Sequence, residues 1–353
     1  MGRPVPKTKR ETLNRSYMEG VLDSIAREHF GPSFGVQGVT VEPCGRRLVR
    51  YHAQVVEGGK SQKLEWKVMG KIFESTDVGK RSFDAIRRVW DNGFSHQDPV
   101  CVRIPEGYSY IPELRLLLME EIPGQPLKKL MKKQVATPEH MRLFGSAMAK
   151  VHRSPLVIGE PFTVEDHLTR RCGALSAALG DAFPGLRDDI RWVVHTALDS
   201  QRRENRNIYT LAHGDFHFGQ VHLESGDLWI LDLDPLHYGD PAYDVAMVFF
   251  AFKQIEKKTK QSGYIHALRD AFVSSYFSMM DWQVARRVPL HEAMIHLKRA
   301  CKRFRWQDEE GWQALIPIQI GQAVTCLEFM KQAKEPRSLA DMVKQYEGCP
   351  GEV

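Results

Sequence analysis

Two neighbouring stretches of the sequence are dense in polar side chains that could do chemistry. Residues 213–222 read HGDFHFGQVH, and residues 230–244 read ILDLDPLHYGDPAYD. Within them, Asp215, Gln220 and Asp232 supply oxygen donors at three points. Oxygen donors suit Mg²⁺, which keeps several waters and is usually shared with the phosphates of a substrate. The pattern therefore indicates a magnesium site.

A predicted hairpin explains how these donors could meet. The segments Gln220–Glu224 and Leu228–Leu233 read as strands, and Ser225-Gly226-Asp227 between them is a turn signal. A hairpin folds its second strand back beside its first, so Asp232 can approach the loop that carries Asp215.

The same block resembles the catalytic segment of the aminoglycoside phosphotransferase and choline kinase family, which has a protein-kinase-like fold. That family runs HGDxHxxN, then a hairpin, then IDxx, then GDPxxDLA. Here the corresponding residues are HGDFHFGQ at 213–220, Leu231-Asp232, and GDPAYDVA at 239–246. Weaker similarities to the family's nucleotide-lysine strand, interlobe hinge and a second-lobe helix occur at VMGKIF (68–73), LLLMEEIPGQPL (116–127) and MAKVH (148–152).

The resemblance implies a phosphotransferase that uses ATP and Mg²⁺ to move the γ-phosphate to a hydroxyl of a small metabolite, such as a sugar, an amino alcohol or an aminoglycoside-like acceptor. Phosphoryl transfer depends on positioning and charge neutralisation more than on covalent chemistry. Asp215 would accept the hydroxyl proton, Asp232 would bind Mg²⁺, and Lys71 would neutralise the α- and β-phosphates. Gln220 stands where most of the family has Asn. Because Gln220 keeps the amide oxygen, we expect it to be a metal ligand too.

The resemblance also assigns residues around the nucleotide. In the family an acid on the helix after the lysine strand holds that lysine, and Asp84 on the predicted helix 81–92 is the candidate here. An aspartate near a helix start equally serves the helix dipole, so that alternative stays open. Asp234 could assist the metal or lie exposed in its turn. The hinge residues expected to offer backbone groups to adenine are Met119, Glu120 and Ile122.

The elements that must hold these residues change in character along the chain. Before the Pro123-Gly124 break, the helix at 81–92 lies among strand-like runs at Leu48–Val56, Leu64–Phe73 and Arg115–Met119. After the break, Thr137-Pro138 is a helix start, and Gly239-Asp240-Pro241 is another that lets Asp240 and Asp244 brace the catalytic loop. The helices expected there are 138–152, Asp188–Gln201, Pro241–Lys257, Ile265–Met280, Leu290–Arg305 and Trp312–Lys334.

This order of elements, together with the resemblance, predicts an α+β, bilobal, protein-kinase-like fold. Residues 1–122 would form a small β-rich nucleotide-binding lobe. Residues 123–353 would form a larger, mostly helical lobe for catalysis and substrate binding. ATP and Mg²⁺ would lie in the cleft.

Composition excludes several other classes of protein. The 49 Lys and Arg residues are interspersed with 44 Asp and Glu residues, so a dedicated nucleic-acid binder is disfavoured. No apolar run approaches the ~18 residues of a membrane span, so no membrane partner is expected. The six cysteines form no CxxC pair, and the N-terminal MGRPVPKTKRETLNR lacks a signal-peptide core. A reducing cytoplasm is the expected compartment, and the sequence does not indicate an oligomeric state.

The sequence leaves two alternative functions open. The alternating His213, Asp215 and His217 would share one face of a strand, as the ligands of a metal-dependent hydrolase do. A kinase-like module that binds nucleotide with little or no catalysis is the other alternative, and it rests on Gln220 and Asp84. Mg·ATP binding without turnover would favour that module, whereas tightly bound zinc or manganese without nucleotide binding would favour the hydrolase.

The acceptor is the least determined part of the function. The segment 304–312, FRWQDEEGW, mixes aromatic and acidic residues that could line a sugar or amine site, although it also reads as a turn between two helices. A polycationic acceptor needs a strongly acidic site, and the near-neutral second lobe does not indicate one. A sugar or small alcohol is therefore favoured over an aminoglycoside.

Overall fold

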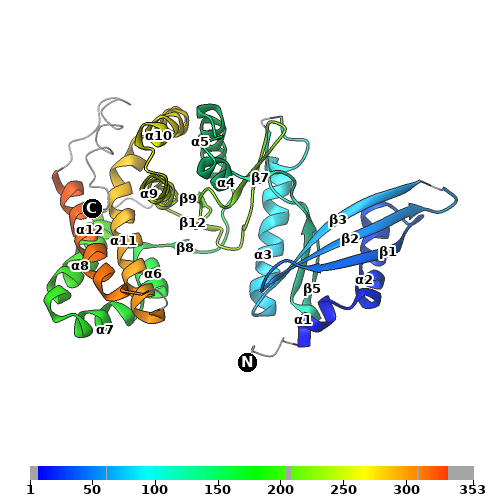
Figure 1. Cartoon of the computed structure of the whole chain (residues 1–353), viewed down its shortest axis with the longest axis horizontal. Helices are drawn as coiled ribbons and strands as arrows, with labels where there is room; N and C mark the ends of the chain where they lie inside the picture. The colour runs from blue at the N-terminus through cyan, green and yellow to red at the C-terminus, as the bar shows by residue number, and fades with distance from the viewer. Residues whose placement is uncertain (1–6, 61, 100, 204–207, 308–309, 333–353) are drawn as a thin grey trace. The chain divides into compact units, whose positions relative to one another are not determined.

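The computed structural model describes residues 7–60, 62–99, 101–203, 208–307 and 310–332 (Figure 1). The chain divides into two compact units, which are Met1–Gln125 with His222–Asp234, and Pro126–Val221 with Pro235–Val353. The expected lobe boundary between residues 122 and 123 stays a prediction. The compact units differ from it chiefly because residues 222–234 group with the first unit.

The first unit is built on a five-stranded antiparallel sheet with the order β1-β2-β3-β6-β5. Its strands are β1 (Phe34–Pro43), β2 (Leu48–Glu57), β3 (Lys63–Ile72), β5 (Gly107–Ile111) and β6 (Leu116–Glu120). Helices α1 (Lys7–Thr12), α2 (Arg15–Phe30) and α3 (Thr76–Val89) accompany the sheet. The register places Lys71 opposite Leu48 of β2 and Leu117 of β6, so this lysine lies on a central strand.

The core of the first unit explains why these strands form. Apolar side chains of α2 and of the sheet pack into one buried cluster, and its members include Met18, Leu22, Val49, Val68, Leu116 and Leu118. Helix α3 begins earlier than the predicted 81–92 helix because the Ser75 side chain accepts a hydrogen bond from the Val78 N–H at 3.3 Å. After α3 the chain kinks at Asn92 and Gly93, whose backbone angles are not helical.

A second, small sheet has the order β4-β11-β10-β7. Its strands are β4 (Val102–Arg103), β7 (Gln125–Pro126), β10 (Val221–Glu224) and β11 (Asp227–Ile230). The predicted hairpin is therefore present, with Ser225 and Gly226 at its turn in the left-handed region, at φ +49° and +91°. Asp232 lies two residues after the end of β11.

The second unit is mostly helical (Figure 1). Its helices are α4 (Leu127–Lys132), α5 (Pro138–His152), α6 (Val164–His167), α7 (Leu175–Ala182), α8 (Arg187–Arg203), α9 (Ala242–Thr259), α10 (Ser262–Phe277), α11 (Gln283–Trp306) and α12 (Trp312–Gln332). A three-stranded sheet joins them, in the order β8 (Pro161–Phe162), β12 (His237–Gly239), β9 (Thr210–Ala212). As expected, α5 starts at Thr137-Pro138, where Thr137 and His140 form a reciprocal cap.

Helices α5 and α10 lie side by side and approach each other closely at Gly145 (Figure 1). A Cβ atom there would meet the Phe272 carbonyl oxygen at 2.8 Å, so a glycine is required for this contact. Beside it, the Ser146 and Ser275 hydroxyls are 2.9 Å apart. Phe144, next to Gly145 on α5, packs on Phe216 and Phe218 of the loop between β9 and β10.

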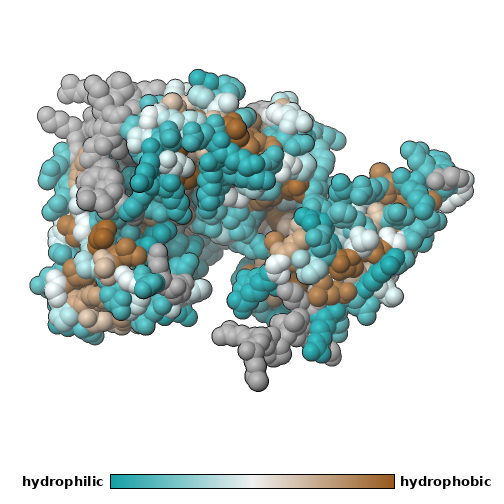
Figure 2. Space-filling view, in the orientation of Figure 1, coloured by the Kyte–Doolittle hydropathy of each residue, from teal (hydrophilic) through white to brown (hydrophobic). Residues whose placement is uncertain are grey.

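The viewed face of each unit is mostly hydrophilic, with smaller patches of apolar residues (Figure 2). In the part of the chain that the structure describes, no helix is both long enough and apolar enough to cross a bilayer.

Candidate active site

The loop between β9 and β10 carries Asp215 and is anchored by two buried phenylalanines. Phe216 and Phe218 are almost fully buried, and their rings pack on Phe144 and Phe252 with centroid distances of 5.3 and 4.7 Å. Between and before these anchors, the Asp215 and His217 side chains stay about one-third exposed. The alternation of apolar and polar residues thus turns the two polar side chains away from the core.

Asp244 of α9 holds the start of this loop in place. Its carboxylate accepts hydrogen bonds from the backbone N–H groups of His213 at 2.6 Å and of Gly214 at 2.8 Å. The imidazole Nε2 of His152 lies 3.1 Å from the same carboxylate. Burial acts to raise the pKa of Asp244, but the hydrogen bond and charge of His152 outweigh burial and lower it. Asp244 therefore stays ionised and fixes the backbone two residues before Asp215.

Gly214 adds a second constraint on the loop. Its φ is +79°, and a Cβ atom would meet the Pro235 carbonyl oxygen at 2.7 Å. Only glycine combines this backbone conformation with such a close approach.

Asp240 holds α9 in place and so positions Asp244. Its buried carboxylate binds the Arg287 guanidinium at 2.8 and 3.0 Å and His291 Nε2 at 2.9 Å, and it accepts the Ala242 N–H at 2.9 Å. Burial acts to raise the pKa of Asp240, but His291 and Arg287 outweigh it and depress the pKa strongly. Asp244 therefore braces the loop directly, as expected, whereas the contacts of Asp240 are to α9 and α11.

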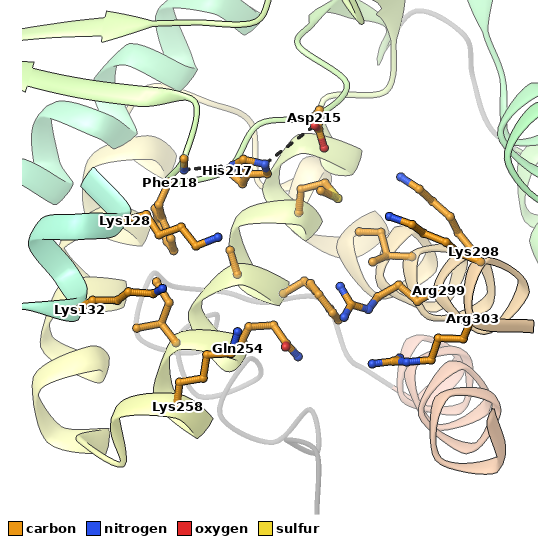
Figure 3. A pocket seen from close by; sticks show the side chains of 17 residues that line it. Lys128, Lys132, Asp215, His217, Phe218, Gln254, Lys258, Lys298, Arg299 and Arg303 are labelled. Atoms are coloured by element: carbon orange, nitrogen blue, oxygen red, sulfur yellow. Dashed lines mark hydrogen bonds and ion pairs between the residues drawn. The ribbon is translucent and has the colours of Figure 1, made fainter. Parts of the chain in front are cut away.

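His217 presents a defined nitrogen to Asp215. The backbone N–H of Gly219 donates to His217 Nδ1 at 3.0 Å, so the neutral ring carries its proton on Nε2. That nitrogen lies 3.9 Å from Asp215 Oδ2 (Figure 3). Burial lowers the pKa of His217 more than the Asp215 charge raises it, so the ring is neutral at neutral pH.

The geometry does not assemble the hydrolase alternative. His213 is completely buried, with its ring stacked on Phe216 at 4.8 Å, and its Nδ1 accepts the Asp215 N–H at 3.4 Å. Among the described residues, no group of three or more His, Cys, Asp or Glu side chains is arranged to hold a metal ion.

Gln220 ends the loop just before β10. Its backbone N–H donates to the His217 carbonyl oxygen at 2.9 Å, and the residue is half-buried. Gln220 and Asp215 belong to the second compact unit, whereas Asp232 belongs to the first.

In the first unit, Lys71 lies beside Asp232, a pairing that differs from the predicted pairing of Lys71 with Asp84. The Lys71 ammonium pairs with the Asp232 carboxylate and lies 2.5 Å from Asp234 Oδ2. Burial acts to lower the pKa of Lys71, but the charges of Asp234 and Asp232 outweigh it and raise the pKa. Asp232 has a φ of +59°, a left-handed conformation that aspartate tolerates better than most residues.

The structure does not bring Asp84 to Lys71. Asp84 forms an ion pair with Lys80 at 3.3 Å, one helical turn away, and its side chain is 53% exposed. Instead, the Ser82 hydroxyl of the same helix donates to Asp234 Oδ1 at 2.6 Å. Residues two apart on a helix point in different directions, so Asp84 faces away when Ser82 faces the lysine. The sequence does not predict this role of Ser82, because a lone helical serine carries no signal of its own.

The predicted hinge residues differ in whether their backbone groups form hydrogen bonds within the protein. Met119 and Glu120 are paired with β3 in the sheet, and the Glu120 N–H also donates to the Glu106 carbonyl oxygen at 2.9 Å. Ile122 follows the strand and has no backbone hydrogen bond within the described residues. Of the three predicted residues, Ile122 is the one whose backbone groups are available to a ligand.

A cavity of about 550 Å³ opens beside Asp215 in the second unit (Figure 3). The loop carrying Asp215 and His217 forms one side, and side chains from α4, α9 and α11 form the others. The Asp215 carboxylate therefore faces a space large enough for a small organic molecule.

The sequence matches the model of a known protein family. Residues 79–283 match the model of the "Phosphotransferase enzyme family". No curated protein sequence matches the chain.

Three solved structures share the fold at low identity. An amicoumacin kinase in complex with AMP-PNP, Ca²⁺ and "Ami" is 13% identical, with a TM-score of 0.57, and covers 86% of this chain and 91% of its own. A Plasmodium vivax ethanolamine kinase is 13% identical, with a TM-score of 0.57 and coverages of 94% and 97%. A choline kinase from Cryptosporidium parvum is 13% identical, with a TM-score of 0.56 and coverages of 89% and 96%. These similarities confirm the predicted α+β, kinase-like fold.

The family match spans more than half of the sequence and contains the Asp215 loop, the hairpin and the start of α9. The chain therefore belongs to the phosphotransferase enzyme family, the aminoglycoside phosphotransferase and choline kinase group of small-molecule kinases that act on hydroxyl acceptors.

Proposed function

We propose that this protein transfers the γ-phosphate of ATP, with Mg²⁺, to a hydroxyl group of a small metabolite. The observation that carries the proposal is Asp215, held on a braced loop at the wall of a cavity of about 550 Å³. Family membership supports the same reaction, and the similar amicoumacin kinase was solved with AMP-PNP and Ca²⁺.

Asp215 is the proposed general base. Its carboxylate would accept the proton of the acceptor hydroxyl while the hydroxyl oxygen attacks the γ-phosphorus. His217 lies beside Asp215, with Nε2 3.9 Å from Asp215 Oδ2, and because its ring is neutral it does not neutralise the carboxylate. The two backbone hydrogen bonds from His213 and Gly214 to Asp244 hold the loop, so little reorganisation is needed when the acceptor binds.

Lys71 is the proposed partner of the nucleotide phosphates. The Asp232 and Asp234 carboxylates keep its ammonium charged and aimed, although the side chain is only 15% exposed. Ile122 is the proposed adenine contact of the hinge, with Met119 and Glu120 shaping the strand before it. Asp84 has no role in this proposal, because it pairs with Lys80.

The donor set fits Mg²⁺. Asp232 and Gln220 are the proposed ligands, since carboxylate and amide oxygens are what this ion prefers, and Asp234 is held beside Asp232 by Ser82. When bound, Mg²⁺ supplies neutralisation of the charge on the nucleotide phosphates.

A second candidate function rests on one observation, the glutamine at position 220. A nucleotide-binding module without turnover would retain Lys71 and Asp232 and lose the fine placement of the metal. Gln220 keeps the amide oxygen on the same loop, so we favour the active enzyme.

An ATP-consumption screen of the purified protein tests the proposal. The panel holds sugars, sugar phosphates, sugar acids, amino alcohols and aminoglycosides, with Mg²⁺ present or chelated. We expect Mg²⁺-dependent ADP formation that requires one acceptor class and is lost in Asp215→Asn. Nucleotide binding with no acceptor-dependent turnover would establish the binding module instead.

A further inference from the structure

The charged side chains that line the cavity beside Asp215 are mostly positive. Helix α4 contributes Lys128 and Lys132 to its lining, and α9 contributes Lys258. Among the described residues that line it, Asp215 is the only acid. Figure 3 shows these side chains reaching the cavity from different helices, with Asp215 at one end.

Helix α11 adds four more cations. Lys298, Arg299, Lys302 and Arg303 all line the cavity, because residues separated by four positions share a face of a helix. The Arg299 guanidinium lies over the Phe250 ring at 4.6 Å, a contact that holds it against the cavity wall.

The acidic residues on these three helices pair with groups that do not line the cavity. Glu256 of α9 pairs with His266 at 3.1 Å, and buried Glu292 of α11 pairs with Lys253 at 3.0 Å. Asp244 braces the Asp215 loop, and α4 contains no acid. None of the three lines the cavity, so the helices that supply its cations do not supply the compensating charge.

Burial, with a smaller effect of nearby positive charges, lowers the pKa values of two groups on α11. Burial, with the charges of Lys253 and Arg299, lowers the pKa of His296 on α11 to about 3. Burial, with the charge of Arg171, lowers the pKa of Lys298 to about 8, although Asp215 acts in the opposite direction. Like charges held close together repel one another, so the cations that line the cavity would attract a bound anion.

We propose that the phosphate acceptor is a small hydroxylated anion, which carries a phosphate or carboxylate group at the end of the molecule remote from the reacting hydroxyl. This inference rests on the proposed phosphotransfer and specifies its substrate class. The hydroxyl meets Asp215, and the anionic group meets the cations of α4, α9 and α11. Choline-like and aminoglycoside-like cations are disfavoured, because the cavity that faces the base would repel them.

The reaction balances without a further reactant. The acceptor oxygen forms a bond to the γ-phosphorus as the bond from that phosphorus to the β-γ bridging oxygen breaks. Asp215 takes the hydroxyl proton and later releases it to water. The products are ADP and an acceptor that carries one additional phosphate.

Binding without nucleotide is the first arm of the test. The probes are inorganic phosphate, ribose 5-phosphate and gluconate, compared with uncharged ribose and glucose and with the cations choline and kanamycin. We expect an anionic probe to bind at least about tenfold more tightly than its uncharged counterpart, with an affinity that falls as salt is added. Comparison of ribose 5-phosphate with gluconate distinguishes phosphate from carboxylate. Equal binding of ribose and ribose 5-phosphate, or tighter binding of a cation, would overturn the proposal.

Matched variants form the second arm. Lys258→Gln and Arg303→Gln each remove one cavity charge, and each should weaken anion binding about tenfold. The controls are Lys257→Gln and Arg305→Gln, which change exposed neighbours on the same helices that do not line the cavity. Thermal unfolding checks that every variant folds. Equal effects of cavity and control variants would show that the cavity is not the anion site.

The two arms separate this inference from the phosphotransfer proposal. Turnover of neutral or cationic acceptors that is unaffected by Lys258→Gln and Arg303→Gln would overturn the anionic acceptor and leave the kinase activity standing. Anion binding at the cavity without any ATP-dependent phosphorylation would overturn the phosphotransfer and leave only an anion site.

Discussion

The Asp244 carboxylate accepts the backbone N–H of His213 at 2.6 Å, although the two residues are 31 positions apart in sequence. Through this bond and its partner from Gly214, helix α9 sets the backbone that carries Asp215. The position of the proposed base is therefore determined by a buried aspartate that has no part in the chemistry.

Asp244→Asn should disrupt this brace. The asparagine amide has only one oxygen, so it cannot accept both backbone N–H groups and also pair with His152. Its N–H₂ group would point at one of these three partners. We expect a loss of about 2–4 kcal/mol in the free energy of unfolding at neutral pH, together with reduced turnover. Denaturant titration measures the loss, with exposed Asp270→Asn of the same unit as the control.

The pH dependence of that loss has a definite sign. The folded-state pKa of Asp244 lies below its ordinary value of 3.8, so its contribution is present above that value and disappears as the pH falls through the folded-state pKa. The wild type and Asp244→Asn should therefore converge in stability in acid. A difference that is constant from pH 7 to pH 3 would contradict the charged brace.

Lys71→Met should weaken Mg·ATP binding, because the methionine cannot neutralise phosphate and leaves Asp232 and Asp234 facing each other. Lys80→Met is the matched control, since Lys80 is an exposed lysine of the same unit that pairs with Asp84. Calorimetric titration with Mg·ATP should show a loss for Lys71→Met alone. Equal affinities in the two variants would remove Lys71 from the nucleotide site.

Substitutions of Asp84 and Asp234 should also differ in their effect on nucleotide affinity. Asp84→Asn should leave nucleotide affinity unchanged, because its carboxylate pairs with Lys80. Asp234→Asn should reduce that affinity, because Asp234 lies 2.5 Å from the Lys71 ammonium. The reverse ranking in the same titration would restore Asp84 as the partner of Lys71.

Gln220→Asn should retain substantial activity and shift the Mg²⁺ concentration required for half-maximal turnover, because the amide oxygen is kept on a shorter side chain. Gln220→Leu has a similar size and no oxygen donor, so it should lose most activity. Turnover measured across a range of Mg²⁺ concentrations checks both. A Leu variant with the wild-type Mg²⁺ profile would show that Gln220 is not a ligand.

Anion binding should weaken as the pH rises through about 8, the value to which burial and nearby Arg171 lower the pKa of Lys298. Lys298 is charged below that pH and neutral above it, so affinity for ribose 5-phosphate should fall by up to about tenfold between pH 7 and pH 9. Lys298→Met should flatten the profile. An unchanged slope in that variant would assign the pH dependence to another group. The groups whose charges or hydrogen bonds act on Lys298 are Arg171, Cys172, Asp215, Tyr243 and Lys302.

The sequence predicts the fold well where local signals agree with the packing. The Ser225-Gly226 turn fixes the β10–β11 hairpin, and Thr137-Pro138 fixes the start of α5, because turn and cap chemistry depend on neighbouring residues only. The Asp215 loop is recognised from the sequence for the same reason, since its glycine and phenylalanines lie within a few residues of Asp215.

The sequence does not predict relationships between distant elements. Ser82 reaches Asp234 across 152 positions, and no pattern in either segment signals it. The charge of the cavity is hidden for a related reason. The lysines and arginines of α4, α9 and α11 are far apart in sequence, and the near-neutral total conceals that they line one cavity.

The most direct test of the central claim is transfer of labelled γ-phosphate from ATP to the acceptor panel by the wild type and by Asp215→Asn. The substitution keeps the size of the side chain and removes the base. The account predicts Mg²⁺-dependent labelling of a hydroxylated acceptor by the wild type. It predicts a rate about 10²–10⁴-fold lower in Asp215→Asn, with Mg·ATP affinity preserved. Equal labelling rates in the two proteins, or no labelled acceptor with the wild type, would contradict it.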